Sequence, residues 1–572
     1  MLFGLSKSVR SFNLISALIL AGTIFQVIPT FKSGLNFIYG LGFWGPNTHD
    51  GVWHMALINQ LIKSVPPENP VFSGSVLKNY HFFYDLLIAA TAFLSKIPVA
   101  DLVFRFYPVI FSLMLGVGSY YLVMRLFEVR LGTKKTKAAS LISLYLIYFA
   151  GSFGWIVEFL RERHFGGESA FWANQAVSFN LNPPFAISLV ITIAIVHITM
   201  SSPNLKGKIV TILLLGTLTS FKSYTGILVL GSLLAVSVIK VFREKDFSYF
   251  WVTSCSIALS AWLFLSNFVA NSVFMIFSPF WFIHSMVDSP DRVGWVRLSL
   301  ARINSFVLGQ WLKFMLAEII SLIFFIIGNL GMRFLSFGVF FKFREIVKND
   351  TFSFIFILSI VSLTIPILFI QSGNPWNTIQ FFYPVLYTSA LFAGVVISSI
   401  IFKLNRISAA VLIGIILILA PVNSIVTARG YFGKAPHAFV SSKELEGLQF
   451  LSARPNGVVL TYPYDKKLKQ NLSEPWPLFV YDSTAYVSAL SNKAAYLEDE
   501  PQNQILLTDY KKRLVASKDF FLKPLSESSK FLQDNHIKYI YLPKIFNIRL
   551  DENSSSIKKI FENKEVMMYE AN

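Results

Sequence analysis

Residues 45–54, which read GPNTHDGVWH, place Asp50 directly after His49, with His54 four residues further on. They lie in the first long polar gap of the chain, just beyond its first hydrophobic run. A carboxylate held there could act as a general base. If a helix begins at this point, Asp50 and His54 lie one turn apart, and with His49 they could hold a divalent cation such as Mg²⁺ or Mn²⁺. The structural alternative is that Asp50 caps a helix beginning at Val52.

The composition is that of an integral membrane protein. Hydrophobic residues make up 54% of the 572 residues and charged residues only 14%, against roughly 25% charged in a soluble domain. Apolar runs of about 20 residues, enough to cross a bilayer, recur along the first three quarters of the chain. The net charge of +18 is explained by Lys and Arg that gather in loops on one side of the membrane, so binding of nucleic acid has no support.

The basic loops predict the topology, because Lys and Arg favour the cytoplasmic side. If all basic clusters are cytoplasmic, the runs between them form about eleven transmembrane helices, with the N-terminus inside the cell and the C-terminal tail outside. The predicted spans are 12–31, 101–127, 138–157, 183–200, 209–221, 225–241, 249–269, 312–330, 352–370, 379–402 and 407–428. One further apolar run, 80–98, is predicted to lie in the outer interface as a helix, preceded by a short helix at 52–64.

The composition changes near Arg429. From 429 to 572 charges of both signs mix and no run is long enough to span, which predicts a separate extracytoplasmic domain. Ser441 and Glu444 have the spacing of a capping box that opens a helix. Strand-like runs at 457–462, 537–543 and 566–571 alternate with helical patterns and favour an α/β fold. We therefore expect a membrane domain at 1–428, with an outer loop at 32–100, and a soluble α/β domain at 429–572.

Ionisable groups near the outer face are costly there and are functional candidates for that reason. Besides His49, Asp50 and His54, the interfacial run carries His81 and Asp85. Candidate cations for binding an anionic group are Arg105, Lys222, Arg292 and Arg297, although interfacial Lys and Arg are often simple anchors. Gln380 could face the substrate cavity that these residues would line, although an amide at a helix start is usually structural.

The order of elements resembles the GT-C superfamily of membrane glycosyltransferases, which includes the protein O-mannosyltransferases and the lipid A aminoarabinose transferases. NTHDGVWHMALINQLIKSVPPENP resembles the acid-bearing outer loop of that superfamily, and LKNYHFFYDLLIAATAFL resembles its second interfacial helix. GTLTSFKSYTGILVLGSLL is similar to a span pair that carries a phosphate-facing lysine, here Lys222. The sequence departs from the acidic pair of the mannosyltransferases, because Gly51 follows Asp50.

The resemblance implies a polyprenyl-phosphate sugar donor and transfer at the outer face of the cell membrane to a glycan, lipid or protein acceptor. Asp50 would deprotonate the acceptor hydroxyl, and direct displacement would invert the anomeric carbon. Lys222, Arg292, Arg297 or Arg105 would bind the donor phosphate, and His49, His54, His81, Asp85 and Gln380 would line the cavity. No cofactor is required by this scheme, although a divalent cation would be compatible with it.

Two other functions remain open from the sequence. A transporter or flippase of lipid-linked sugars would also have many helices, but it usually carries ionisable residues at mid-membrane, whereas here the acidic residues gather at one face. An oligosaccharide polymerase or ligase would use a large late outer loop, whereas the late outer loop here, 371–378, is short.

Overall fold

The structure of the chain, a computed structural model, describes residues 2–201, 204–265, 275–342, 348–522, 525–550 and 555–572. The chain forms two compact units. Of the described residues, the first unit, the membrane unit, contains those within 2–29, 108–265 and 275–433, and the second, the outer unit, contains those within 30–107 and 434–572. The outer loop thus belongs to the same compact unit as the C-terminal residues. The predicted domain boundaries stay a prediction.

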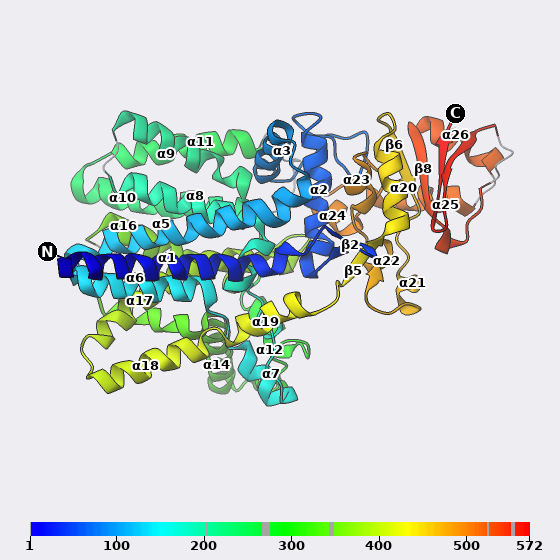
Figure 1. Cartoon of the computed structure of the whole chain (residues 1–572). Helices are drawn as coiled ribbons and strands as arrows, with labels where there is room; N and C mark the ends of the chain where they lie inside the picture. Colours follow the sequence, from blue (N-terminus) through cyan, green and yellow to red (C-terminus); the bar gives the residue numbers. More distant parts are fainter. Residues whose placement is uncertain (1, 202–203, 266–274, 343–347, 523–524, 551–554) are drawn as a thin grey trace. The chain divides into compact units, whose positions relative to one another are not determined.

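The membrane unit is a bundle of helices (Figure 1). Its helices are α1 (Leu2–Phe31), α5 (Tyr107–Leu131), α6 (Thr133–Phe149), α7 (Gly154–Glu162), α8 (Pro183–Thr199), α9 (Leu205–Phe221), α10 (Ser223–Glu244), α11 (Ser248–Leu265), α12 (Trp281–Asp288), α13 (Val296–Val307), α14 (Trp311–Leu330), α16 (Asp350–Leu368), α17 (Tyr383–Ile401), α18 (Arg406–Leu419) and α19 (Val422–Gly433). The 3₁₀ segments η3 (Glu168–Ala170), η4 (Ala176–Leu181), η5 (Gly331–Lys342) and η6 (Pro375–Phe382) and the antiparallel strands β3 (Met275–Phe277) and β4 (Phe369–Gln371) complete it.

Among the described residues, seven helices are long and apolar enough to cross a membrane, or eight if the bent pair α6 and α7 is one span. The chain is therefore a multi-pass membrane protein, and the predicted fold class is confirmed. Three other expected spans are short helices: α8 and α9 have 17 residues and α11 has 18. At 1.5 Å per residue they reach about 26 Å, slightly less than the hydrocarbon core. The expected span at 249–269 ends in residues that lie outside the described ones.

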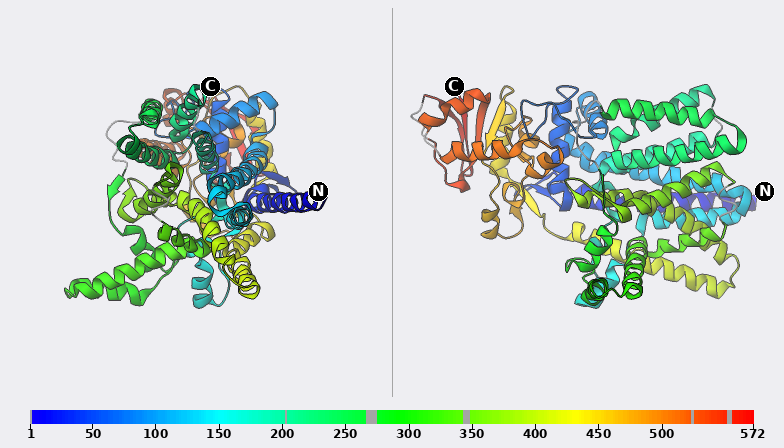
Figure 2. Two further views of the ribbon diagram at one scale, coloured as in Figure 1. Left: turned by 90° about the vertical axis from the view of Figure 1, so that its left-hand side faces the viewer. Right: turned by 180° about the vertical axis from the view of Figure 1, so that it is seen from behind.

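Helix α14 departs from the predicted topology. It passes the test of length and hydropathy for a span, as expected for 312–330. It nevertheless runs across the direction of the other helices, because it is seen end-on in Figure 1 and extends sideways with α13 in the left view of Figure 2. Apolar length alone does not fix the direction of a helix, which depends on its neighbours.

Small residues bring α6 and α17 into close contact. A Cβ on Gly394 would lie 2.1 Å from Ser143 Oγ and 2.7 Å from the carbonyl oxygen of Ala139. Ser143 Oγ donates to the carbonyl of Leu391 (3.2 Å), and Ser398 Oγ donates to the carbonyl of Lys135 (2.8 Å). Close backbone approach with interhelical hydrogen bonds is how helices associate in lipid, where burial of apolar surface gives little driving force.

The outer unit contains two four-stranded sheets. The first has the order β6-β8-β10-β9, in which β6 (Val458–Thr461) and β8 (Ile537–Pro543) are parallel, and β10 (Val566–Ala571) is antiparallel to β8 and to β9 (Ile557–Glu562). Three of these strands are the expected ones. Helix α20 (Ser442–Ser452) begins as predicted, with Ser441 Oγ accepting from the Glu444 amide at 2.9 Å. The predicted C-terminal α/β fold is present.

The second sheet joins the outer loop to the C-terminal residues. Its order is β1-β2-β5-β7, where β1 (Leu35–Phe37) and β2 (Gly40–Phe43) come from the loop, and β5 (Ala438–Ser441) and β7 (Trp476–Pro477) come from the C-terminal part. The loop helices are α2 (Asp50–Leu61), α3 (Phe83–Ser95) and α4 (Val99–Asp101), with η1 (Gly45–Thr48) before them and the π-helical η2 (Leu102–Phe106) after them. The C-terminal part adds α21 (Lys466–Gln470), α22 (Leu478–Tyr481), α23 (Tyr486–Ser491), α24 (Glu500–Ile505), α25 (Tyr510–Leu522), α26 (Leu525–Asp534) and η7 (Lys544–Phe546).

We predict that Gly394→Val destabilises the membrane unit by about 1–3 kcal/mol, because the carbonyl of Ala139 blocks the added side chain and α6 must move. Gly414→Val on α18 is the matched control, since no atom lies within 4 Å of a Cβ there. Thermal unfolding in detergent measures both variants. Equal melting temperatures for the two variants would contradict the close contact between α6 and α17.

Candidate functional site

Asp50 is the first residue of α2 rather than its cap, which is His49. Its side chain is 61% exposed, and its negative charge at a helix N-terminus is favourable. A Cβ on the next residue, Gly51, would lie 2.7 Å from Cε1 of Phe104. A second carboxylate directly after Asp50 would therefore clash with this ring, which gives a physical reason for the departure from the acidic pair.

His49 bridges two carboxylates that are far apart in the sequence. Its Nδ1 lies 3.0 Å from Asp50 Oδ1, and its Nε2 lies 2.9 Å from Asp499 Oδ1. Because a carboxylate oxygen accepts hydrogen bonds, both contacts are satisfied together when both ring nitrogens carry protons. Burial acts to lower the pKa of His49, but Asp499 and Asp50 outweigh it and raise that pKa well above 6.5. Both carboxylates therefore favour the protonated, imidazolium form of His49.

Asp499 is fixed by its place in the fold. Its side chain is fully buried, and the same Oδ1 accepts from the amide of Gln502 (3.0 Å) at the start of α24. The backbone of Asp499 is left-handed, with φ at 51°, a conformation that costs free energy for a residue other than glycine. The fold holds Asp499 in place, and His49 transmits that constraint to Asp50.

His54 and Asp85 form a second buried pair. Nδ1 of His54 lies 2.6 Å from Asp85 Oδ1, and this contact ties α2 to α3. Burial raises the pKa of Asp85, although His54 opposes the shift. Because His54 is bonded to Asp85, the pair holds the two loop helices together. This contact is a structural role for both residues, and their predicted place in the substrate cavity stays a prediction.

Two other predicted residues of the outer unit have protein partners. The guanidinium of Arg105 bonds Asp101 Oδ1 (2.6 Å) and the carbonyls of Phe31 (3.1 Å) and Ser33 (2.7 Å). The ring of His81 stacks on Tyr80, with centroids 4.8 Å apart. Their predicted roles, donor phosphate for Arg105 and cavity for His81, stay predictions.

The predicted cations of the membrane unit lie in different settings. Lys222 is 6% exposed and has an extended backbone conformation between α9 and α10. Its Nζ lies 5.1 Å from the ring centroid of Tyr224. The guanidinium of Arg292 lies 3.7 Å from the ring centroid of Trp172, and burial lowers its pKa, although Asp291 opposes the shift. Arg297 is exposed on α13. Their phosphate-binding roles also stay predictions.

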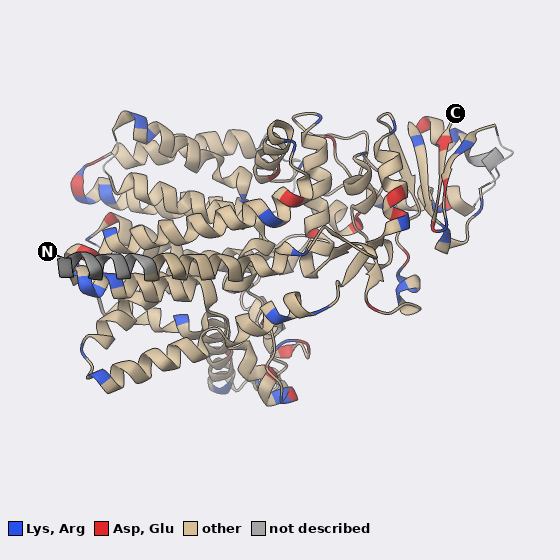
Figure 3. Ribbon diagram, viewed as in Figure 1, with Lys and Arg blue, Asp and Glu red and all other residues tan. Residues whose placement is uncertain are grey.

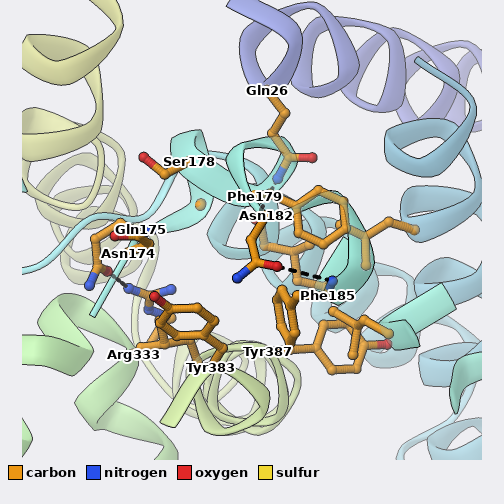
Figure 4. Close-up of a pocket in the computed structure, with 15 residues that line it drawn as sticks. Gln26, Asn174, Gln175, Ser178, Phe179, Asn182, Phe185, Arg333, Tyr383 and Tyr387 are labelled. Carbon is orange, nitrogen blue, oxygen red and sulfur yellow. Dashed lines mark hydrogen bonds between the residues drawn. The ribbon is translucent and has the colours of Figure 1, made fainter. Parts of the chain in front are cut away.

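A pocket in the membrane unit contains a cation that sequence analysis missed. It has a volume of about 500 Å³ and is lined by amide and aromatic side chains and by Arg333, which is 2% exposed. In Figure 4 the side chains of Gln26 and Arg333 point toward the pocket from opposite sides, and Asn182 lies between them. Arg333 donates through Nε to the carbonyl of Leu330 (3.0 Å) and through Nη2 to Oε1 of Gln175.

Other polar residues contact the residues that line this pocket. Asn182 Nδ2 donates to Gln380 Oε1 (3.0 Å), so Gln380 touches a residue that lines the pocket. Glu168 lies in the electrostatic field of Arg333, and burial raises the pKa of Glu168 to about 7. Arg333 lies three residues after the predicted span 312–330. An arginine so close to a long apolar run was the signal that could have revealed it.

One group of three residues in the described part of the chain could hold a metal ion. Ligand atoms of Glu158, Glu162 and His164 all lie within 4.8 Å of one another. Arg161 is paired with Glu158 (3.1 Å) and with Glu162 (3.0 Å), and His164 contacts Glu162 (3.0 Å). The donor set suits a divalent cation, which would replace Arg161 as the partner of the carboxylates.

Comparisons with known proteins agree with the fold. No family model matches the sequence, and a search of curated proteins gives no match. Two structures of oligosaccharyltransferase from Archaeoglobus fulgidus are similar. One, a complex with zinc and sulfate, has a TM-score of 0.53 at 12% identity and covers 92% of this chain and 68% of its own. The other, AglB with an inhibitory peptide and a dolichol-phosphate, has a TM-score of 0.51 at 12% identity, over 95% and 70%.

A third structure, ArnT from Cupriavidus metallidurans bound to undecaprenyl phosphate, covers 98% of this chain and 97% of its own at 11% identity, with a TM-score of 0.45. The first two similarities extend over nearly the whole chain, which is a polytopic membrane protein with the fold of these oligosaccharyltransferase structures. At 12% identity they show the fold alone. The resemblance drawn from the sequence is confirmed at that level.

The bridge predicts a pH-dependent stability. Since folding raises the pKa of His49 above 6.5, the stabilisation is complete below that value and is lost as the pH rises through the folded pKa. We expect His49→Gln to lower the melting temperature most at acidic pH, with the difference from wild type shrinking as the medium becomes alkaline.

The matched control is His164→Gln, since the His164 side chain is 60% exposed. Melting curves of the full chain in detergent, recorded across neutral pH, measure the effect. A destabilisation by His49→Gln that is constant with pH would contradict an imidazolium at this position.

Proposed function

We propose that the protein is a membrane glycosyltransferase that moves a sugar from a polyprenyl-phosphate donor to an acceptor hydroxyl, with inversion at the anomeric carbon. The observation that carries this proposal is Asp50, an exposed carboxylate at the start of α2 whose imidazole partner His49 is bonded to a buried second carboxylate. The similarity of fold to oligosaccharyltransferases supports it.

Asp50 is the proposed general base. Its carboxylate takes the proton of the acceptor hydroxyl while that oxygen forms a bond to the anomeric carbon, and the bond from this carbon to the phosphate oxygen breaks. A positioned base contributes about 10² to 10⁴ in rate. His49 orients the carboxylate through the contact at 3.0 Å.

The leaving group is a polyprenyl phosphate that gains negative charge, so it needs cations in a place that excludes water. The pocket of Arg333 offers a buried guanidinium among amide donors, including Gln26 and Asn182, together with aromatic walls. Such a lining suits a phosphate attached to a lipid. Lys222 and Arg292 remain alternative cations, as the sequence suggested.

A divalent cation is compatible with this scheme. Glu158, Glu162 and His164 would hold it, and Mg²⁺ or Mn²⁺ would supply charge neutralisation for the departing phosphate when bound. The similar oligosaccharyltransferase structure contains zinc. Arg161 supplies positive charge to the same carboxylates in the structure described here.

We propose a cytoplasmic N-terminus and an extracytoplasmic C-terminal domain in the cell membrane. The distribution of charge supports this orientation, because Lys and Arg gather at the end of the helix bundle where the N-terminus lies (Figure 3). Positive residues favour the cytoplasmic side.

Asp50→Asn is expected to lower sugar transfer by about 10² to 10⁴ while leaving donor binding unchanged, since the amide keeps the shape but takes no proton. The assay is mass spectrometry of surface glycans and of accumulated lipid-linked sugars in cells carrying each variant. Asp509→Asn is the matched control, because the Asp509 side chain is also 61% exposed. Normal glycans with Asp50→Asn would rule out this carboxylate as the base.

Arg333→Gln is expected to weaken binding of undecaprenyl phosphate by about 10- to 100-fold, because a charge-assisted contact to phosphate is lost. Native mass spectrometry of the purified protein measures the binding, and Arg333→Lys tests whether charge alone suffices. Arg292→Gln and Arg297→Gln are compared directly. If either of these weakens binding while Arg333→Gln does not, the phosphate is bound elsewhere.

A further inference from the structure

The outer unit contains a pocket that the catalytic proposal does not use. It has a volume of about 400 Å³ and is lined by residues of three segments, 461–464, 479–486 and 497–500, together with Leu514. Four carboxylates line it: Asp482, Glu498, Asp499 and Glu500. Among the described residues that line it there is no lysine, arginine or histidine, so the pocket is strongly acidic.

One oxygen in this pocket lacks a hydrogen-bond partner although it is buried. Asp499 is fully buried, its Oδ1 accepts from His49 and from the amide of Gln502, and its Oδ2 has no partner among the described residues. The hydroxyl of Thr484, which is 4% exposed and lines the same pocket, also has none. A buried carboxylate oxygen without a donor costs free energy, and a ligand that supplies donors would recover it.

The other carboxylates increase the demand for a positive charge. Both oxygens of Glu498 accept hydrogen bonds, from the amides of Val487 (3.0 Å) and Ser488 (2.9 Å), yet burial raises its pKa to about 7. Burial also raises the pKa of Glu500, with Lys518 opposing the shift and Asp482 adding to it. These acids therefore lie in a setting that disfavours their negative charge, and a bound cation would stabilise it.

Aromatic rings provide the remaining walls. Tyr462, Tyr464, Phe479 and Tyr486 all line the pocket. Ring faces attract ammonium groups, and a compact ammonium has three donors for the unpartnered oxygens. A neutral sugar would donate to some of the oxygens but brings no positive charge, and no basic side chain stands among the described residues that line the pocket.

We propose that this pocket binds a primary ammonium group carried by the acceptor. The inference rests on the proposed function, because it assigns the pocket to the acceptor of the transfer. Asp499 connects the two sites: it lines the pocket, and its Oδ1 is bonded to His49, which is bonded to Asp50. The acceptor is thereby anchored two side chains away from the base that takes its proton.

The test is a direct binding measurement that requires no transfer. Purified full-length protein is titrated with 2-aminoethyl glucoside and, as the neutral counterpart, with 2-hydroxyethyl glucoside, using saturation-transfer NMR at physiological salt. We expect the amine to bind at least about 10-fold more tightly. Equal binding of the two glucosides would assign the pocket to hydroxyl recognition, and absence of amine binding at millimolar concentration would also overturn the proposal.

Two variants locate the binding. Asp499→Asn should weaken amine binding by at least about 10-fold, and Glu500→Gln, which lies at the partly exposed part of the pocket, by about threefold. Glu446→Gln is the control for loss of charge, because it lies on α20 and its side chain is 50% exposed. If both variants fold and bind the amine as tightly as wild type does, the ammonium site is not this pocket. Because Asp50→Asn tests transfer separately, failure of one proposal is distinguishable from failure of the other.

Discussion

The contact between His49 and two carboxylates is the interaction on which the proposed chemistry depends. An exposed aspartate at the start of a helix has many rotamers, and a general base must lie in one of them. The imidazole of His49 removes that freedom, because one nitrogen bonds Asp50 and the other bonds a carboxylate that the fold has buried. The outer loop and the C-terminal residues must therefore fold together before Asp50 is positioned.

The same constraint explains why the outer unit combines the outer loop with the C-terminal residues. The sheet β1-β2-β5-β7 pairs loop strands with C-terminal strands, and the amide of Gly45, the first residue of η1, donates to Nδ1 of His437 (3.1 Å). Asn59 of α2 donates to the carbonyl of Ala489 (2.8 Å). These contacts hold the start of α2 against the C-terminal residues, which places His49 within reach of Asp499. In the membrane unit, a buried charged group such as Arg333 is costly unless it is paired. Arg333 is hydrogen-bonded to the carbonyl of Leu330 and to Gln175.

Much of the fold could be predicted from local patterns. Apolar runs and basic loops located the helices, and alternation of residue types located β6, β8 and β10, because these signals depend on neighbours in sequence. The direction of α14 could not be predicted, since its apolar length suits both a span and a helix lying across the bundle. The sheet that joins the loop to the C-terminal part was missed because its strands are two to four residues long and the loop pair is separated from the C-terminal pair by about 400 positions.

The candidate site was predictable in part for the same reason. His49 and Asp50 stand together in the sequence, but Asp499 lies 450 residues away from His49, and no spacing rule connects them. The protonation state of His49 tests the account most directly. In protein labelled with ¹⁵N at histidine and held well above pH 6.5, we predict an imidazolium at His49 in wild type and a neutral ring in Asp499→Asn. A neutral His49 in the wild-type protein would contradict the bridge that positions Asp50.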